Sequence, residues 1–169
     1  MDTLLAYILT IVGSVPDYAQ KLTLAAIAGL LIGFERELRG KPASLRTFSA
    51  ICVGSCLFTI LSSNGLQSDS PLFDPSRIAA QIVSGVGFLG AGVIFKTTNR
   101  IEGITTAALI WLAAALGMAA GFGKPMMVVW ALILGAGINI LIWCIYKIIF
   151  AYRKSVAAEG EVVEPPVDG

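Results

Sequence analysis

The sequence contains no histidine, and it is poor in charge, with only 14% Asp, Glu, Lys and Arg. The lack of imidazole excludes histidine as a general base, as a metal ligand and as the middle member of a catalytic triad. Soluble domains carry about a quarter charged residues. The chain therefore lacks the polar surface of a soluble protein, and no nucleophile–base arrangement marks it as an enzyme.

Cysteine and clustered basic residues are also scarce. The three cysteines, Cys52, Cys56 and Cys144, lie inside apolar runs, where they are interpreted as small packing residues because two thiols alone make a poor metal site. The net charge of +1 does not fit the basic face of a nucleic-acid binder. Residues 1–15 have neither a basic start nor a small-residue cleavage site, so no secretory signal is expected.

Long apolar stretches of helical character dominate the chain, which is 56% hydrophobic with a mean hydropathy of +0.81. A membrane-crossing helix needs about 20 predominantly apolar residues. We therefore predict an all-α, polytopic membrane helix bundle with about five transmembrane helices. The predicted spans are Tyr18–Glu35, Leu45–Leu61, Arg77–Phe95, Ile104–Ala120 and Pro125–Ala151.

The two ends of the chain are predicted to differ from the transmembrane part, residues 17–154. Residues 1–16 have helical periodicity but are short for a span, which favours a helix at the membrane surface, with a sixth, short span as the alternative. Asp17 and Gln20 resemble a capping box, and Asp74-Pro75 marks the start of the third span. Residues 155–169 are acidic, and a disordered tail is expected there.

Basic residues are distributed unequally between the predicted loops. Nine lie on one membrane side: Arg36, Arg39, Lys41, Arg46, Lys96, Arg100, Lys147, Arg153 and Lys154. Three lie on the other side: Lys21, Arg77 and Lys124. The positive-inside rule places the side with nine in the cytoplasm. We therefore expect a multi-pass protein with a cytoplasmic C-terminus.

Charged residues between the first two spans form the first candidate site. Glu35 and Arg46 fall at the ends of these spans, on the same membrane side. A carboxylate near hydrocarbon needs a partner, which suggests a Glu35–Arg46 ion pair that closes the loop. Arg39 and Lys41 are interpreted as interfacial side chains that extend towards water.

The third span carries four glycines within eight residues: Gly85, Gly87, Gly90 and Gly92. The letters match a dinucleotide-binding fingerprint, but no strand precedes them, which excludes that function. Within a span, such a series permits close helix packing or a locally broken helix that faces protein or water. Two further pairs favour close packing: Gly29 with Gly33, and Gly117 with Gly121.

Polar residues in the later spans complete the candidates. Gln81, Ser84 and Asn139 lie inside spans, where they either bond neighbouring helices or line a path. The threonines that open the fourth span either cap that helix or accompany free backbone N–H groups that bind an anion. Asp74 and Arg77 mark a helix start. The predicted polar cytoplasmic site comprises Glu35, Arg36, Arg46, Thr47, Thr105 and Thr106.

Three stretches resemble the MgtC/SapB family of bacterial inner-membrane proteins. They are Gly33–Glu37 with Pro42–Thr47, then Asp74–Gly92, then Gly103–Gly121. The resemblance covers roughly residues 22–123 and implies a place in the bacterial inner (plasma) membrane. Two features depart from the family: Ser44 stands where glycine is usual, and a short acidic stretch follows Lys154 where better-known members continue into a soluble domain that resembles a ligand-sensing fold.

The resemblance implies a process, magnesium homeostasis, and leaves the activity open. Family members are linked either to Mg²⁺ transport or to restraint of the membrane ATP synthase. Mg²⁺ requires oxygen ligands, typically carboxylates, and loses its water reluctantly. No carboxylate lies inside predicted spans two to five. The metal site therefore stays undefined, no cofactor is expected, and Mg²⁺ enters only as a transported or sensed ion.

Three hypotheses for the activity follow. The first is transport of Mg²⁺ or its support. The second is regulation of another membrane protein complex through the glycine-rich faces. The third is binding of an anion or lipid headgroup by basic residues at the cytoplasmic side: Arg36, Arg46, Lys96 and Arg100. In each case the partners are the lipid bilayer and, because glycine-rich faces favour close contact between helices, further copies of the chain.

Overall fold

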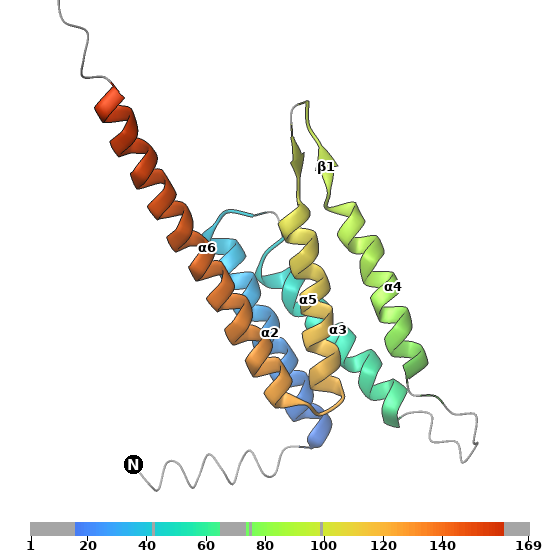
Figure 1. The fold of residues 1–169 in the computed structure, drawn as a ribbon. Coiled ribbons are helices and arrows are strands. Elements are labelled where there is room, and N and C mark those ends of the chain that lie inside the picture. The colour runs from blue at the N-terminus through green and yellow to red at the C-terminus, as the bar shows by residue number, and fades with distance from the viewer. Residues whose placement is uncertain (1–15, 42, 65–73, 75, 99, 161–169) are drawn as a thin grey trace, which may run out of the picture. The chain divides into compact units, whose positions relative to one another are not determined.

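The computed structural model describes residues 16–41, 43–64, 74, 76–98 and 100–160 of the chain (Figure 1). The chain divides into two units, one that ends at Val129 and one that begins at Trp130. Five helices make up almost all of the described structure: α2 (Asp17–Leu38), α3 (Leu45–Asn64), α4 (Ser76–Gly92), α5 (Ile104–Gly121) and α6 (Pro125–Gly160). The predicted all-α helix bundle is confirmed.

Three of these helices are long and apolar enough to cross a membrane, over Leu45–Ser63, Ile104–Gly121 and Pro125–Phe150. The other two fall short for different reasons. In α2, charged residues flank both ends of an apolar stretch that runs from Leu22 to Phe34, and α4 has only 17 residues. The five predicted helices are present, and three of them meet the length and composition of a span by themselves.

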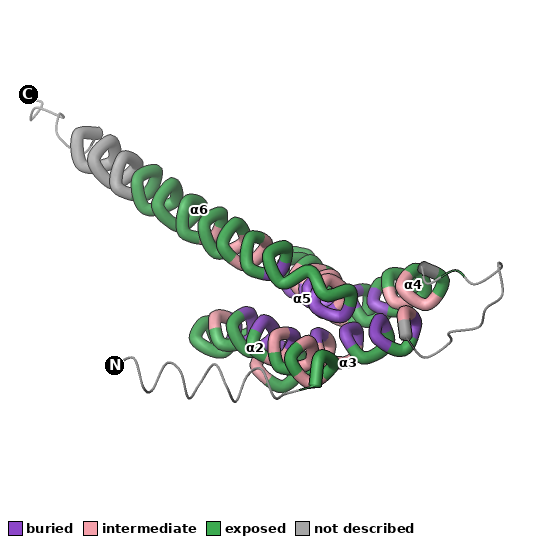
Figure 2. The backbone as a smooth tube through the Cα atoms, turned by 90° about the horizontal axis from the view of Figure 1, so that it is seen from below, coloured by how far each residue is buried: buried purple, intermediate pink, exposed green. Residues whose placement is uncertain are grey.

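Helices α2, α3 and α5 form the core of the first unit, and Figure 2 shows buried residues on all three. A Cβ at Gly29 would lie 2.6 Å from the Phe48 carbonyl oxygen, so the α2 and α3 backbones are in contact. A Cβ at Gly117 would lie 2.2 Å from the Cys52 carbonyl oxygen on the other side of α3. Both predicted glycine pairs therefore allow close helix packing, as small residues do in membrane bundles.

Buried side chains pack against these backbones. Phe48 of α3 and Ile110 of α5 are among the largest fully buried side chains, together with Val128 at the start of α6. Cys52 is also fully buried, and its Sγ donates a hydrogen bond to the Ala113 carbonyl oxygen over 3.1 Å. The interpretation of Cys52 as a packing residue agrees with this position.

A β-hairpin stands where a plain loop was predicted. The third helix ends at Gly92 instead of Phe95, and two short antiparallel strands follow, β1 (Phe95–Lys96) and β2 (Ile101–Glu102). Gly103 joins β2 to α5 with φ +89°, and a Cβ there would lie 1.9 Å from the Val93 carbonyl oxygen. Only glycine permits this turn, which closes the hairpin tightly onto the end of α4.

Several predicted helix ends also need correction. The capping box at Asp17 and Gln20 is wrong, because Pro16 occupies the N-cap position and no side chain caps the helix; Asp17 instead pairs with Lys21 at 2.6 Å. Helix α3 continues beyond the predicted Leu61, to Asn64.

Helix α6 continues beyond its predicted end at Ala151 and runs to Gly160. The first residues of the predicted tail are therefore helical, because alanine and glutamate there favour helix. The predicted interfacial helix at residues 1–15 and the tail at residues 161–169 lie outside the described residues, so both stay predictions.

Candidate functional site

The candidate site lies at one end of the first unit, which we call the hairpin end. Here the end of α2, the start of α3, the end of α4 and the start of α5 lie together beside the hairpin (Figure 1). This arrangement agrees with the prediction that the first charged cluster and the start of the fourth span share one membrane side. Lys21, Arg77 and Lys124 belong to helix ends at the opposite side.

The hairpin end contains a cluster of ion pairs at the end of α2. The Arg36 Nε atom donates to Glu35 Oε2 over 2.5 Å, and Arg36 Nη2 donates to Glu35 Oε1 over 2.7 Å. Arg39, one turn later, also pairs with the Glu35 carboxylate. We call Glu35, Arg36 and Arg39 the α2 ion-pair cluster.

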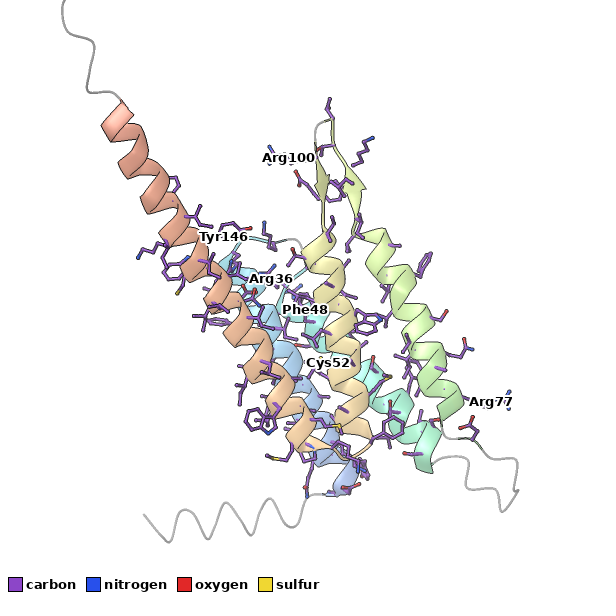
Figure 3. All side chains as sticks on the ribbon, viewed as in Figure 1. Arg36, Phe48, Cys52, Arg77, Arg100 and Tyr146 are labelled. Carbon is purple, nitrogen blue, oxygen red and sulfur yellow. The ribbon has the colours of Figure 1, made fainter. Side chains whose placement is uncertain are left out.

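Arg36 is buried, with only 4% of its surface exposed, whereas the Arg39 side chain is 48% exposed. Figure 3 shows Arg36 on α2, towards the hairpin end from Phe48. The cause is periodicity: the buried face of α2 recurs through Ala25, Gly29 and Gly33, and the next position on that face is Arg36. A buried arginine requires a partner for its charge, and Glu35 supplies it.

The α2 ion-pair cluster also sets the protonation of Glu35, which lies beyond the apolar stretch of α2. Hydrogen bonds from Arg36, with the positive charges of Arg36 and Arg39, hold the pKa of the Glu35 carboxyl below its ordinary value of 4.5, although burial acts in the opposite direction. Glu35 is therefore a carboxylate at neutral pH, fully engaged with two arginines.

The predicted Glu35–Arg46 ion pair is wrong. Arg46 is exposed at the start of α3, and within the described residues it takes part in no ion pair. The physical reason is local: Arg36 and Arg39 follow Glu35 on the same helix and reach its oxygens without closing a loop. Arg39, interpreted as a simple interfacial residue, is thus part of the cluster that the sequence reasoning missed.

The six residues of the predicted polar cytoplasmic site do not converge. Thr106 is buried in the first turn of α5, whereas Thr105 beside it is exposed. Thr47, like Arg46, is exposed on the first turn of α3. The buried members are thus Arg36 and Thr106, and Glu35 is half-buried beside Arg36.

The four basic residues proposed to bind an anion also differ in their exposure and in their ion-pair partners. Arg36 is already engaged with Glu35, and the Arg100 Nε atom lies 3.9 Å from Glu102 Oε1 in the hairpin. Lys96 and Arg46 are exposed. The positions of these four residues therefore give no argument for one shared anion site.

The glycine series of α4 behaves differently from the glycine pairs of the core. A Cβ built at Gly85, Gly87 or Gly92 would meet no atom within 4 Å, and one at Gly90 would make only an ordinary contact with Ala107, at 3.7 Å. The helix is continuous from Ser76 to Gly92, so the broken-helix alternative is wrong. Close packing inside the unit accounts for Gly90 alone.

The polar residues inside the helices also separate into two kinds. Asn139 donates a hydrogen bond from Nδ2 to the Gly135 carbonyl oxygen of its own helix over 2.9 Å. Gln81 and Ser84 are exposed on α4, and no described residue forms a hydrogen bond with either side chain. At the start of α4, the Arg77 N–H donates to the Asp74 carbonyl oxygen over 3.4 Å, which agrees with the predicted helix start.

In the described part of the chain, no three Cys, Asp or Glu side chains lie close enough together to hold a metal ion. The core of the first unit is mainly apolar, and the carboxylates of Glu35 and Glu102 at the hairpin end are paired with arginines. Together, the continuous apolar helices, their glycine contacts and the charged hairpin end define a multi-pass membrane protein.

The family follows from comparison with known proteins. The model of the MgtC family matches residues 22–147, so the chain belongs to this family. It is 49% identical over 113 residues to Protein SapB of Bacillus subtilis, a match that covers 64% of this chain and 49% of SapB. It is 52% identical over 111 residues to the Putative magnesium transporter YhiD of Escherichia coli, covering 63% of this chain and 52% of YhiD.

A third relative is Protein MgtC of Brucella abortus, 48% identical over 99 residues, a match that covers 59% of this chain and 40% of that protein. The chain thus spans about half the length of the curated relatives that it matches. No solved structure matches the chain. The resemblance of its motifs to the MgtC/SapB family is confirmed.

Proposed function

We propose that this chain serves magnesium homeostasis in a bacterial inner membrane, and that it acts there as a regulatory protein that binds another membrane protein complex. The magnesium link is supported by family membership and by the name of the Escherichia coli relative, Putative magnesium transporter YhiD. The regulatory activity is supported by the packing of the first unit. The ATP synthase is the complex that the family resemblance suggests.

The observation that carries this proposal is the closed interior of the α2–α3–α5 core. The three backbones are in contact at Gly29 and Gly117, and Phe48 and Ile110 fill the remaining space. Mg²⁺ keeps several of its waters and requires oxygen ligands, and this interior offers neither room nor carboxylates. Exposed polar side chains of α4, Gln81 and Ser84, form no hydrogen bond with a described residue, which supports binding to a partner over conduction through the core.

Transport of Mg²⁺ is the second candidate. A specific feature favours it: Gln81 lines a groove of about 560 Å³ between α3 and α4. A side-chain amide oxygen is a ligand that a hydrated Mg²⁺ accepts. The other residues that line this groove are overwhelmingly apolar, which suits a hydrocarbon partner better than an ion.

Two assays on the same chain separate the two candidates. Purified full-length chain in liposomes that enclose a Mg²⁺-sensitive dye is expected to give influx no faster than empty liposomes, with an ionophore as the positive control. The same chain, expressed in a bacterium that lacks its own family member, is expected to restore growth at low Mg²⁺. Influx clearly above background that drops in Gln81→Leu would replace the regulatory proposal with transport.

The orientation in the membrane gives a separate prediction. We expect the hairpin end to face the cytoplasm, because it carries the excess of basic residues. In a chain with its native cysteines replaced by alanine, a cysteine at Thr98 should react with a membrane-impermeant maleimide only after cells are permeabilised. A cysteine at Lys124, at the opposite end, should react in intact cells, and the reverse pattern would invert the topology.

A further inference from the structure

The β-hairpin between α4 and α5 carries exposed apolar and basic side chains together. Phe95 and Ile101 are each more than half exposed, and Lys96 and Arg100 are exposed as well. The strand register pairs Lys96 with Ile101 and Phe95 with Glu102. Residues directly opposite each other in an antiparallel pair lie on the same face. Each face of the hairpin therefore combines an apolar side chain with a charged one, and neither face is a core face of the first unit.

The lengths of α4 and α5 place the hairpin at the depth of the lipid headgroups. At 1.5 Å per residue, their 17 and 18 residues measure about 26 and 27 Å, slightly less than the hydrocarbon core of a bilayer, which is about 30 Å thick. The hairpin continues from the shared end of these two helices (Figure 1), and the close approach of Gly103 to the Val93 carbonyl oxygen fixes it there. Its strands therefore lie in the interfacial layer, which adds about 5–8 Å on each side of the core.

The hairpin end also has an excess of positive charge. Its basic residues are Arg36, Arg39, Lys41, Arg46, Lys96 and Arg100, and its acidic residues are Glu35, Glu37 and Glu102. Lys41, Arg46 and Lys96 are exposed, and none of them forms an ion pair with a described residue. Basic side chains beside a membrane are attracted to anionic lipids, so the charge of this end is complementary to phosphate headgroups.

We propose that the hairpin binds anionic phospholipids, with Phe95 and Ile101 among the upper parts of the acyl chains and with Lys96 and Arg100 at headgroup phosphates. Apolar side chains beside long basic ones suit a layer that has hydrocarbon on one side and phosphate on the other. The basic residues do not converge on one anion site, and this arrangement does not require them to, because neighbouring headgroups bind separately.

The same arrangement favours lipid over a protein partner. A protein that covered the hairpin would bury Lys96 beside Ile101 and would have to place a carboxylate against the buried ammonium group. Headgroups surround this layer in every bilayer, and the Lys96 ammonium group remains hydrated among them. A zwitterionic headgroup carries its own cation, which opposes lysine and arginine, so the preference is for headgroups of net negative charge.

The first experiment measures the depth of the hairpin in liposomes of phosphatidylcholine and phosphatidylglycerol. In a full-length chain whose three exposed tryptophans are replaced by phenylalanine, Phe95→Trp is expected to be quenched by lipids brominated near the headgroup end of the acyl chains and to be protected from aqueous acrylamide. The matched control is Thr98→Trp at the exposed tip of the hairpin, which acrylamide should quench. Equal acrylamide quenching at both positions would place the hairpin in water and overturn the proposal.

The second experiment measures the choice of headgroup with the same Phe95→Trp reporter. Energy transfer to phosphatidylglycerol with pyrene in one acyl chain is expected to exceed transfer to phosphatidylcholine with the same label. Lys96→Gln should lower the relative affinity for phosphatidylglycerol about fivefold, whereas Lys96→Arg should preserve it. Lys124→Gln, at the opposite end of the first unit, should leave the signal unchanged. Equal transfer to the two lipids, or equal losses in Lys96→Gln and Lys124→Gln, would contradict selective binding by the hairpin.

A third measurement separates lipid from a protein at the same place. In native membranes, a photoreactive side chain introduced at Ile101 is expected to give lipid adducts, seen by mass spectrometry as a mass increase of the intact chain. Crosslinking to one defined polypeptide in place of lipid would overturn the proposal. That result would leave the proposed regulatory function standing and would assign its contact to the hairpin.

Discussion

Replacing Gly117 with alanine is expected to lower the stability of the first unit by about 3 kcal/mol, the upper range for overpacking a closed core. The added Cβ would lie 2.2 Å from the Cys52 carbonyl oxygen and 2.9 Å from Ser55 Cβ, so a backbone must move. The shift separates α5 from α3 and weakens the contacts of Ile110 and Phe48 along the same interface. Thermal unfolding in detergent, followed by circular dichroism, measures the change.

Gly54→Ala is the matched control, because it makes the same substitution on the helix that Gly117 contacts. A Cβ at Gly54 would meet nothing within 4 Å, and alanine favours helix by about 1 kcal/mol over glycine. We expect Gly54→Ala to unfold at the wild-type temperature or slightly above it. If both variants lose stability equally, the backbone contact between α3 and α5 does not hold the core together.

Replacing Arg36 with alanine is expected to have the second large effect, a loss of about 3 kcal/mol, because the buried side chain packs inside the unit and its removal leaves Glu35 with Arg39 alone. Arg36 is almost fully buried, and it provides two hydrogen bonds to the Glu35 carboxylate. The substitution also leaves a cavity on the face of α2 that packs against the core. Chemical denaturation of the detergent-solubilised chain gives the free-energy difference.

Arg39→Ala provides the comparison on the same carboxylate. Its side chain is half exposed, and exposed ion pairs contribute at most about 1 kcal/mol, so Arg39→Ala should lose far less stability than Arg36→Ala. Equal losses would mean that burial of Arg36 adds nothing to its pair with Glu35.

The pH dependence of stability provides an independent check on the α2 ion-pair cluster. Because the folded pKa of Glu35 lies below 4.5, the contribution of this carboxylate is fully present above pH 4.5 and is lost as the pH falls through its lowered folded value. Arg36→Ala should therefore remove much of this acid-sensitive part of the stability, and the wild-type and variant curves should converge as the pH falls.

The sequence by itself determined the helices and, to within about one residue, where each of them starts. Long apolar runs of helical character form helices in a membrane. Lipid offers no hydrogen bonds to the backbone, and a helix satisfies its own backbone N–H and C=O groups. The start of α5 at Ile104 and of α6 at Pro125 follow from Gly103 and from the Gly123-Lys124 turn, and both were predicted. Close packing at the glycine pairs of α2 and α5 was likewise predicted, because their spacing places both members of each pair on one helix face.

Only the tertiary structure decided which polar residue meets which. Glu35 was expected to pair with Arg46 across a loop, but Arg36 and Arg39 on the same helix reach it first, and no spacing rule ranks a local partner against a distant one. The sequence also allowed close helix packing for the glycines of both α4 and α5. The structure separates them, because whether a glycine touches another backbone depends on where the neighbouring helix lies, and that position is set by the packing of all three core helices together.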